Sequence, residues 1–155
     1  MELLSEKIFA VILTALAPTA ELRVAIPLGF TQGLDPLTVV LVAVIANCVV
    51  FFPGFFLADL VSTKILSNRR RTSRFFERSR KPGMSLINKY GFVGLAIFVA
   101  MPLPFSGAWT GAILARLLGL EWKRSFLSVS IGIVIAALLV SFLTASFLRL
   151  SGFGF

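Results

Sequence analysis

Residues 18–33 read PTAELRVAIPLGFTQG and follow the apolar run of residues 8–17. They place Glu21 and Arg23 inside a segment that otherwise has the composition of a lipid-exposed helix. Ionisable side chains at membrane depth are costly and normally face protein or a water-filled cavity. Pro18 and Pro27 each remove a backbone hydrogen bond that a membrane helix needs. The stretch therefore predicts a broken membrane segment with a polar site at the break.

The apolar residues on the two sides of this break form two half-length arms. As helices, residues 8–17 and 22–32 would each span roughly 15 Å, about half of a ~30 Å hydrocarbon core. These lengths favour a re-entrant hairpin that enters the membrane, turns near its midplane and leaves on the same side. The alternative is one kinked helix over residues 8–30, which the arm lengths alone leave open.

The composition predicts an integral membrane protein. The chain is 57% hydrophobic, with a mean hydropathy of +0.95, beyond what a soluble domain of this size needs. Nine of its fifteen Lys and Arg residues lie within residues 62–90, which contain one acid, Glu77. This concentration identifies a cytoplasmic linker by the positive-inside rule and argues against nucleic-acid binding. With no His and a lone Cys48, we expect no metal site, cofactor, intrachain disulfide or enzymatic activity.

The second half of the chain repeats the pattern of the first half. Residues 91–101 and 108–118 are half-length arms around a Pro-Leu-Pro break, and 24-residue apolar spans cover 37–60 and 125–148. A shift of 86 residues places Pro18 on Pro104 and Gly33 on Gly119. The sequence thus predicts a single all-α membrane domain, residues 1–155. Repeat one is 1–61, the basic linker is 62–90, and repeat two is 91–155.

Charge on the loops favours two hairpins over two kinked spans. If each broken segment is a hairpin, Arg116, Lys123 and Arg124 share the cytoplasmic face with the linker. The two repeats then enter the membrane from opposite faces, which makes them inverted repeats of the kind found in transporters. We expect a multi-pass protein of the cell (inner or plasma) membrane with both termini outside.

The candidate site residues share a position at or near the two breaks. Arg23 supplies a positive charge for a phosphate or carboxylate, and Glu21 can exchange a proton because burial disfavours its charged form. Ser106 is a candidate cap for residues 108–118. The alternative for Glu21 and Arg23 is a structural pair. The substrate or proton pathway is assigned to Glu21, Arg23, Pro18, Pro27, Asn47, Pro102, Pro104, Ser106, Trp109 and Arg116.

The linker also carries a candidate lipid site. Phe75 and Phe76 lie among arginines, so a surface helix could place its rings among headgroups and its cations on anionic lipid; the simpler interpretation is a topology signal alone. Pro82-Gly83 is expected to end that helix. The headgroup ligands would be Arg69, Arg70, Arg71, Arg74 and Arg78.

The stretches ELRVAIPLG and PLPFSGAWTGAILA resemble the small multi-drug export protein family, which is distantly similar to the DedA superfamily. The resemblance covers roughly residues 6–147, and the most specific part is Glu21 to Pro27. It implies a membrane transporter. The DedA similarity implies opposed re-entrant hairpins and movement of lipid carriers such as undecaprenyl phosphate. Gly107 and Trp109 stand where the repeat would place partners of Glu21 and Arg23, which argues against a symmetric charged site.

These observations lead to two functional hypotheses. The first is a small transporter or lipid-carrier translocase, with proton coupling as a further element, for an anionic or amphipathic substrate. The alternative is a structural or assembly protein that binds anionic lipid or a partner through its linker. We further expect a homodimer, because two spans cannot easily shield the backbone groups that two broken segments expose.

Overall fold

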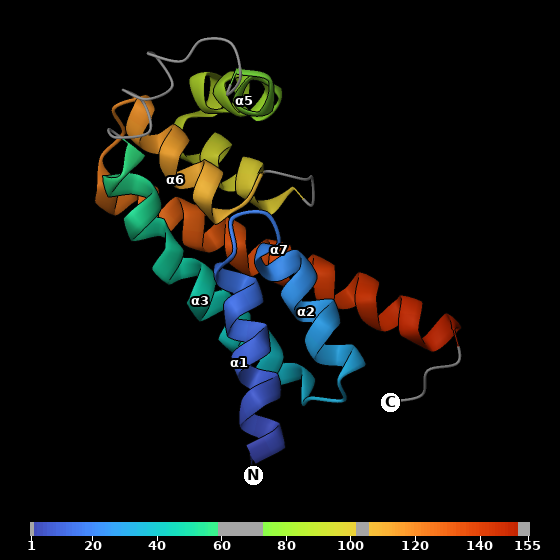
Figure 1. The fold of residues 1–155 in the computed structure, drawn as a ribbon. Coiled ribbons are helices and arrows are strands. Elements are labelled where there is room, and N and C mark those ends of the chain that lie inside the picture. Colours follow the sequence, from blue (N-terminus) through green and yellow to red (C-terminus); the bar gives the residue numbers. More distant parts are fainter. Residues whose placement is uncertain (1, 59–72, 102–105, 152–155) are drawn as a thin grey trace.

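The computed structural model describes residues 2–58, 73–101 and 106–151, together with the side chains of residues 3–58, 85–101 and 106–151. Within these ranges the regular structure is helical, as expected, and contains no strand (Figure 1). The helices are α1 (Glu2–Leu16), α2 (Glu21–Thr31), α3 (Pro36–Phe56), α5 (Ser73–Ala100), α6 (Ala108–Leu117) and α7 (Trp122–Leu150).

Two helices are long and apolar enough to cross a membrane. α3 has 21 residues and α7 has 29, and both are strongly apolar along their length. At a rise of ~1.5 Å per residue they reach about 31 and 43 Å, against a hydrocarbon core of ~30 Å. α3 leaves one stripe of large apolar side chains uncovered by protein, as a lipid-facing helix does. The stripe consists of Leu37, Leu41, Ile45, Val49, Phe52 and Phe56.

α1 and α2 lie side by side and are joined by a short turn over residues 17–20 (Figure 1). The Lys7 Nζ donates to the Gln32 carbonyl at 2.9 Å, so the start of α1 lies beside the end of α2. The two helices are therefore antiparallel. α1 is longer than the expected arm because the helix already begins at Glu2.

The second pair of helices is the last part of α5 with α6. α5 is interrupted at Gly91, whose backbone has φ +57° and ψ −127°. The expectation that Pro82-Gly83 ends the linker helix is wrong, since the helix continues through them to Tyr90. Glycine enters the left-handed region without a Cβ clash, so the chain bends at Gly91. Beyond the bend, Val99 of α5 packs against Gly111 of α6.

The turns that end α2 and α6 have the same backbone conformation. Gly33 and Gly119, which are 86 residues apart, have φ values of +70° and +69°. The Leu34 N–H donates to the Gly29 carbonyl at 3.2 Å, and the Leu120 N–H donates to the Ala115 carbonyl at 3.0 Å. Both are Schellman ends, which satisfy carbonyls at a helix terminus and favour glycine at the left-handed residue.

The first residues of α3 and α7 differ in how they are capped. Asp35 precedes α3 and accepts two 2.8 Å hydrogen bonds from Thr38, one from its N–H and one from its hydroxyl. These bonds hold the pKa of the Asp35 carboxyl below its usual value. The corresponding Glu121 makes no side-chain cap on α7 and instead lies 3.3 Å from Arg124.

Candidate functional site

Glu21 links the two halves of the molecule. It follows the turn after α1, has a φ of +49°, and is only 5% exposed. Its Oε1 accepts a hydrogen bond from the Trp109 backbone N–H at 3.3 Å, and the Ala108 N–H also bonds to the carboxylate. Ala108 and Trp109 begin α6, where backbone N–H groups have no partner within the helix. A carboxylate is favoured at this positive end of the helix dipole, so Glu21 of the first half of the chain caps α6 in the second half.

Gly107 makes room for this cap. It directly precedes α6, and a Cβ atom built on it would overlap the Glu21 carboxylate. No side chain other than hydrogen fits there while Glu21 stays in place. The 86-residue shift aligns Glu21 with Gly107, so two equivalent positions of the repeats contact each other.

Arg23 binds the end of α5. Its guanidinium donates to the Met101 carbonyl at 2.8 Å and to the Ser106 Oγ at 2.9 Å. The Ser106 hydroxyl donates to the same Met101 carbonyl at 2.7 Å. The hydroxyl hydrogen of Ser106 is thus directed to the preceding helix end, and a cap of residues 108–118 by its oxygen stays a prediction. Arg23 also lies close enough to Glu21 to interact with it electrostatically.

Trp109 makes the corresponding contact on the first half. Its indole Nε1 donates to the carbonyl of Leu16, the last residue of α1, at 3.0 Å. The shift of 86 residues aligns Arg23 with Trp109. Arg23 therefore donates to a carbonyl at the end of α5, in the second half of the chain, and Trp109 donates to a carbonyl at the end of α1, in the first half. We call Glu21, Arg23, Gly107 and Trp109 the cross-capping cluster.

Asn47 joins the cluster from α3. Its side chain is fully buried, and its Nδ2 donates to the Ala15 carbonyl at 3.2 Å and to the Ala43 carbonyl at 3.0 Å. Among the described residues its Oδ1 has no hydrogen-bond partner. Asn47 and Trp109 thus bind adjacent carbonyls, those of Ala15 and Leu16, where α1 ends.

The structure brings together only part of the predicted pathway. Pro18 is exposed in the turn, and Pro27 lies within α2, which continues past it. Arg116 is in the last turn of α6, where its Cζ lies 5.7 Å from the ring centroid of Phe55. Pro102 and Pro104 lie outside the described residues. The predicted lipid ligands lie outside the residues whose side chains are described: Arg69, Arg70, Arg71, Arg74 and Arg78.

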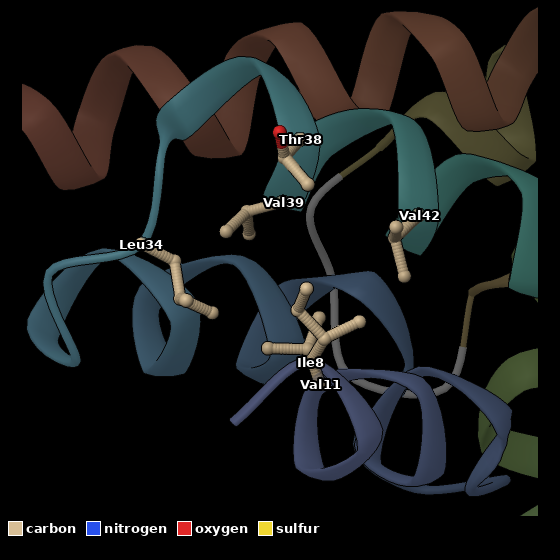
Figure 2. A pocket seen from close by; sticks show the side chains of 6 residues that line it. All are labelled: Ile8, Val11, Leu34, Thr38, Val39 and Val42. Atoms are coloured by element: carbon tan, nitrogen blue, oxygen red, sulfur yellow. The ribbon is translucent and has the colours of Figure 1, made fainter. Parts of the chain in front are cut away.

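A recess between α1 and α3 is separate from the cluster. Figure 2 shows its lining side chains converging from α1, from the end of the α2 turn and from the first turns of α3. These side chains are apolar apart from the hydroxyl of Thr38: Ile8, Val11, Leu34, Thr38, Val39 and Val42. The recess is filled by its own side chains and offers no ligand for a charged substrate.

The indole of Trp109 is expected to contribute to stability through a single bond. Trp109→Phe removes the only donor that the structure shows for the Leu16 carbonyl among the described residues. The bond is partly buried, and an unsatisfied acceptor costs about 1–3 kcal/mol when it is fully buried, so we expect a loss near the lower end of that range. Thermal melting in detergent should show this loss. The matched control is Trp122→Phe at the exposed start of α7, where the change should stay within about 0.5 kcal/mol. Equal melting temperatures for both variants would contradict a structural role for the bond.

Sequence reasoning singled out Glu21, Arg23, Ser106, Trp109 and Asn47, but it missed the contacts between them. The repeat contained the missing signal. Aligning Glu21 with Gly107, and Arg23 with Trp109, led to the expectation that a symmetric charged site was absent. In the structure Glu21 contacts Gly107, whereas Arg23 and Trp109 each donate to a backbone carbonyl of the opposite half of the chain.

Comparison with known proteins adds one match. A family model described as Putative small multi-drug export protein matches residues 21–139, a range that begins at Glu21 and contains the whole cross-capping cluster. No curated protein and no solved structure matches the chain.

Proposed function

The chain belongs to the family described as Putative small multi-drug export protein, and from that premise we propose that it transports an anionic or amphipathic substrate across the membrane with proton coupling. The observation that carries this proposal is the buried carboxylate of Glu21 at the first turn of α6. A charged side chain at membrane depth is a candidate for a transport pathway.

The cluster supplies a chemical basis for two states. Ionised Glu21 accepts hydrogen bonds from the N–H groups at the start of α6 and holds the two halves together. Protonation removes its negative charge, so the charge-assisted bonds weaken. The N–H groups of Ala108 and Trp109 are then available to a phosphate or carboxylate of the substrate. Proton uptake and substrate binding at one position would couple the two movements.

The inverted-repeat architecture is part of the same proposal. The antiparallel α1–α2 pair, the matching Schellman turns and the mutual capping support two opposed hairpins that meet near the midplane. Transporters built in this way bind substrate at the repeat interface and use broken helices to present backbone groups.

Transport by purified protein in liposomes tests this function. The lumen would be set more acidic or more alkaline than the bath, with a fluorescent lipid-linked phosphate and a cationic dye as the two substrates. We expect the anionic amphiphile to move at a rate that depends on the pH gradient and that a protonophore abolishes. Movement of neither substrate, or movement of the cationic dye without a pH gradient, would contradict the proposal.

A structural membrane protein is the second candidate, and one observation favours it. Glu21, Arg23 and Trp109 all satisfy backbone groups at helix ends, which is a sufficient role for each in folding. The linker would then recruit anionic lipid or a partner protein. The two candidates differ in the expected effect of neutralising Glu21. If the protein is a transporter, the variant is stable but does not transport. If the protein is structural, the variant accumulates to a lower level.

The topology is expected to place residues 5 and 151 outside and residue 73 inside. Single cysteines at Ser5, Ser73 and Ser151 in a Cys48→Ser background would be treated with a membrane-impermeant maleimide in intact cells. The first and third should react, and the second should react only after permeabilisation. Reaction of the cysteine at 73 alone would show that the topology is the reverse of the expected one. Reaction of only one terminus would show that one hairpin is a kinked span.

We also propose a homodimer, although the structure changes the reason for it. The described ends of α1, α5 and α6 are bonded by Trp109, Arg23 and Glu21 of the same chain, so those groups need no second chain. Gly132 of α7 packs against Val99 of the same chain, but the partly exposed Ser141, Thr144 and Ser146 still allow close approach of another copy. Native mass measurement in nanodiscs should give two chains per particle. Full activity with one chain per nanodisc would refute the dimer.

A further inference from the structure

Charged side chains are divided unequally between the two ends of the helices. At one end, α3 and α6 finish and α7 begins (Figure 1). The Arg116 Cζ lies 5.7 Å from the Phe55 ring, and the Arg124 Cζ lies 6.0 Å from the Phe92 ring beside the bend of α5. These contacts join α3, α5, α6 and α7 at the same end, which we call the basic end.

The basic end carries four described cations and one carboxylate: Lys89, Arg116, Lys123, Arg124 and Glu121. The opposite end, which holds the start of α1, the start of α3 and the end of α7, carries two of each sign among the side chains that the structure describes: Glu6, Asp35, Lys7 and Arg149. Even without Lys89, which belongs to the linker, three cations and one carboxylate remain at this end. The excess of positive charge there therefore does not depend on the linker.

Exposed aromatic rings accompany these cations. The Lys89 Nζ lies 5.1 Å from the Tyr90 ring centroid, and the Lys123 Nζ lies 5.7 Å from that of Trp122. Tyr90 is 49% exposed and Trp122 is 42% exposed. Tyr and Trp gather at the level of lipid headgroups because their rings are amphipathic. Glu121 neutralises Arg124 only weakly, since both side chains are well exposed at a 3.3 Å separation.

On one face of α7, an exposed apolar stripe follows the cation of Lys123. Lys123 is followed at helical spacing by exposed large side chains, namely Leu127, Ile131, Val134 and Leu138. The apolar part of this stripe, Leu127 to Leu138, extends roughly 17 Å along the helix axis, close to one leaflet of a ~30 Å hydrocarbon core. A cationic position with an apolar stripe of that length fits one phospholipid, with its phosphate at the cation and an acyl chain along the stripe.

We propose that the basic end binds anionic phospholipid headgroups of one leaflet, with Lys123 and Arg124 as the main phosphate ligands. Arg presents a planar fork of donors that matches phosphate oxygens, and Lys adds a compact charge. The first turn of α7 has no side-chain cap, so its backbone N–H groups face the same region and add to the attraction for an anion. The partner is therefore an anionic phospholipid, for which phosphatidylglycerol serves as the probe.

Lipid exchange on the purified full-length chain tests this inference. Protein in nanodiscs of mixed phosphatidylglycerol and phosphatidylcholine would be released into the mass spectrometer, and the ratio of the two lipids retained would be counted. Lys123→Gln with Arg124→Gln should lower the preference for phosphatidylglycerol by about fivefold for each charge removed. The matched control, Lys7→Gln with Arg149→Gln at the opposite end, removes the same charge and should leave the preference unchanged.

Three results would overturn the inference. The first is that the wild-type chain retains both lipids equally. The second is that the two double variants lower the preference equally, which would make net charge the cause. The third is that replacing Arg69, Arg70 and Arg71 with Gln removes the whole preference while the Lys123 and Arg124 variant keeps it, which would assign lipid binding to the linker. The folding of each variant is checked by its melting temperature.

Discussion

Glu21→Gln is expected to reduce proton-coupled transport to the rate of empty liposomes while leaving a folded protein in the membrane. Glutamine has nearly the same shape and keeps an oxygen that can accept from the Trp109 N–H. It cannot ionise, so the negative charge at the start of α6 and the proton exchange are lost together. The remaining neutral bond is weaker than a charge-assisted one by about 1 kcal/mol, which predicts only a modest fall in melting temperature.

Two comparisons make this prediction specific. Glu121→Gln removes the same charge from an exposed side chain at the basic end, and its transport should equal that of the wild type. Arg23→Gln should also abolish transport, because it removes the charged donor to the Met101 carbonyl. Wild-type transport by Glu21→Gln would exclude Glu21 as the coupling group. Failure of the variant to accumulate would favour the structural candidate instead.

Gly107→Ala is expected to destabilise the protein more than any other single methyl addition at the cluster. The new Cβ would overlap the Glu21 carboxylate, so Glu21 must leave the start of α6 or the helices must separate. Overpacking of a well-packed site costs about 1–3 kcal/mol, and losing hydrogen bonds to a charged group costs about 1.5–3 kcal/mol. We therefore expect a loss of about 3 kcal/mol, measured as a fall in melting temperature and in accumulation.

A second background separates this clash from ordinary glycine effects. In Glu21→Ala the carboxylate is absent, so the Cβ at residue 107 has space. Gly107 has a φ of −96°, which any residue can adopt, and Gly→Ala at such a position stabilises by about 0.4–1 kcal/mol. Gly107→Ala should thus lower the stability of the wild-type protein and raise the stability of the Glu21→Ala variant. A similar loss of stability in both would show that the contact with Glu21 is not the cause.

The sequence indicated several elements of this protein for local reasons. Two long apolar runs had to become helices that present side chains to lipid, because backbone groups in hydrocarbon must be bonded internally. Gly33 and Gly119 marked helix ends, since a left-handed residue after a helix strongly favours glycine. Glu21 and Arg23 were recognisable because ionisable residues are rare in such surroundings. In each case the chemistry of a residue and of its neighbours in the sequence was sufficient to predict the element.

The partners of those residues were decided by the tertiary structure. Glu21 is bonded to backbone N–H groups 87 and 88 positions away, and Arg23 to a backbone carbonyl 78 positions away. A backbone group carries no mark in the sequence that identifies it as a partner. The helix break in the linker was likewise expected at Pro82-Gly83 and lies at Gly91.

The sequence therefore indicated most of the helical segments and the ionisable residues that lie among apolar ones. Only the packing of the two halves decided what those charges bind, because the unsatisfied N–H and C=O groups at a helix end look alike in every sequence. Their partners are set by which helix end the fold brings within hydrogen-bonding distance.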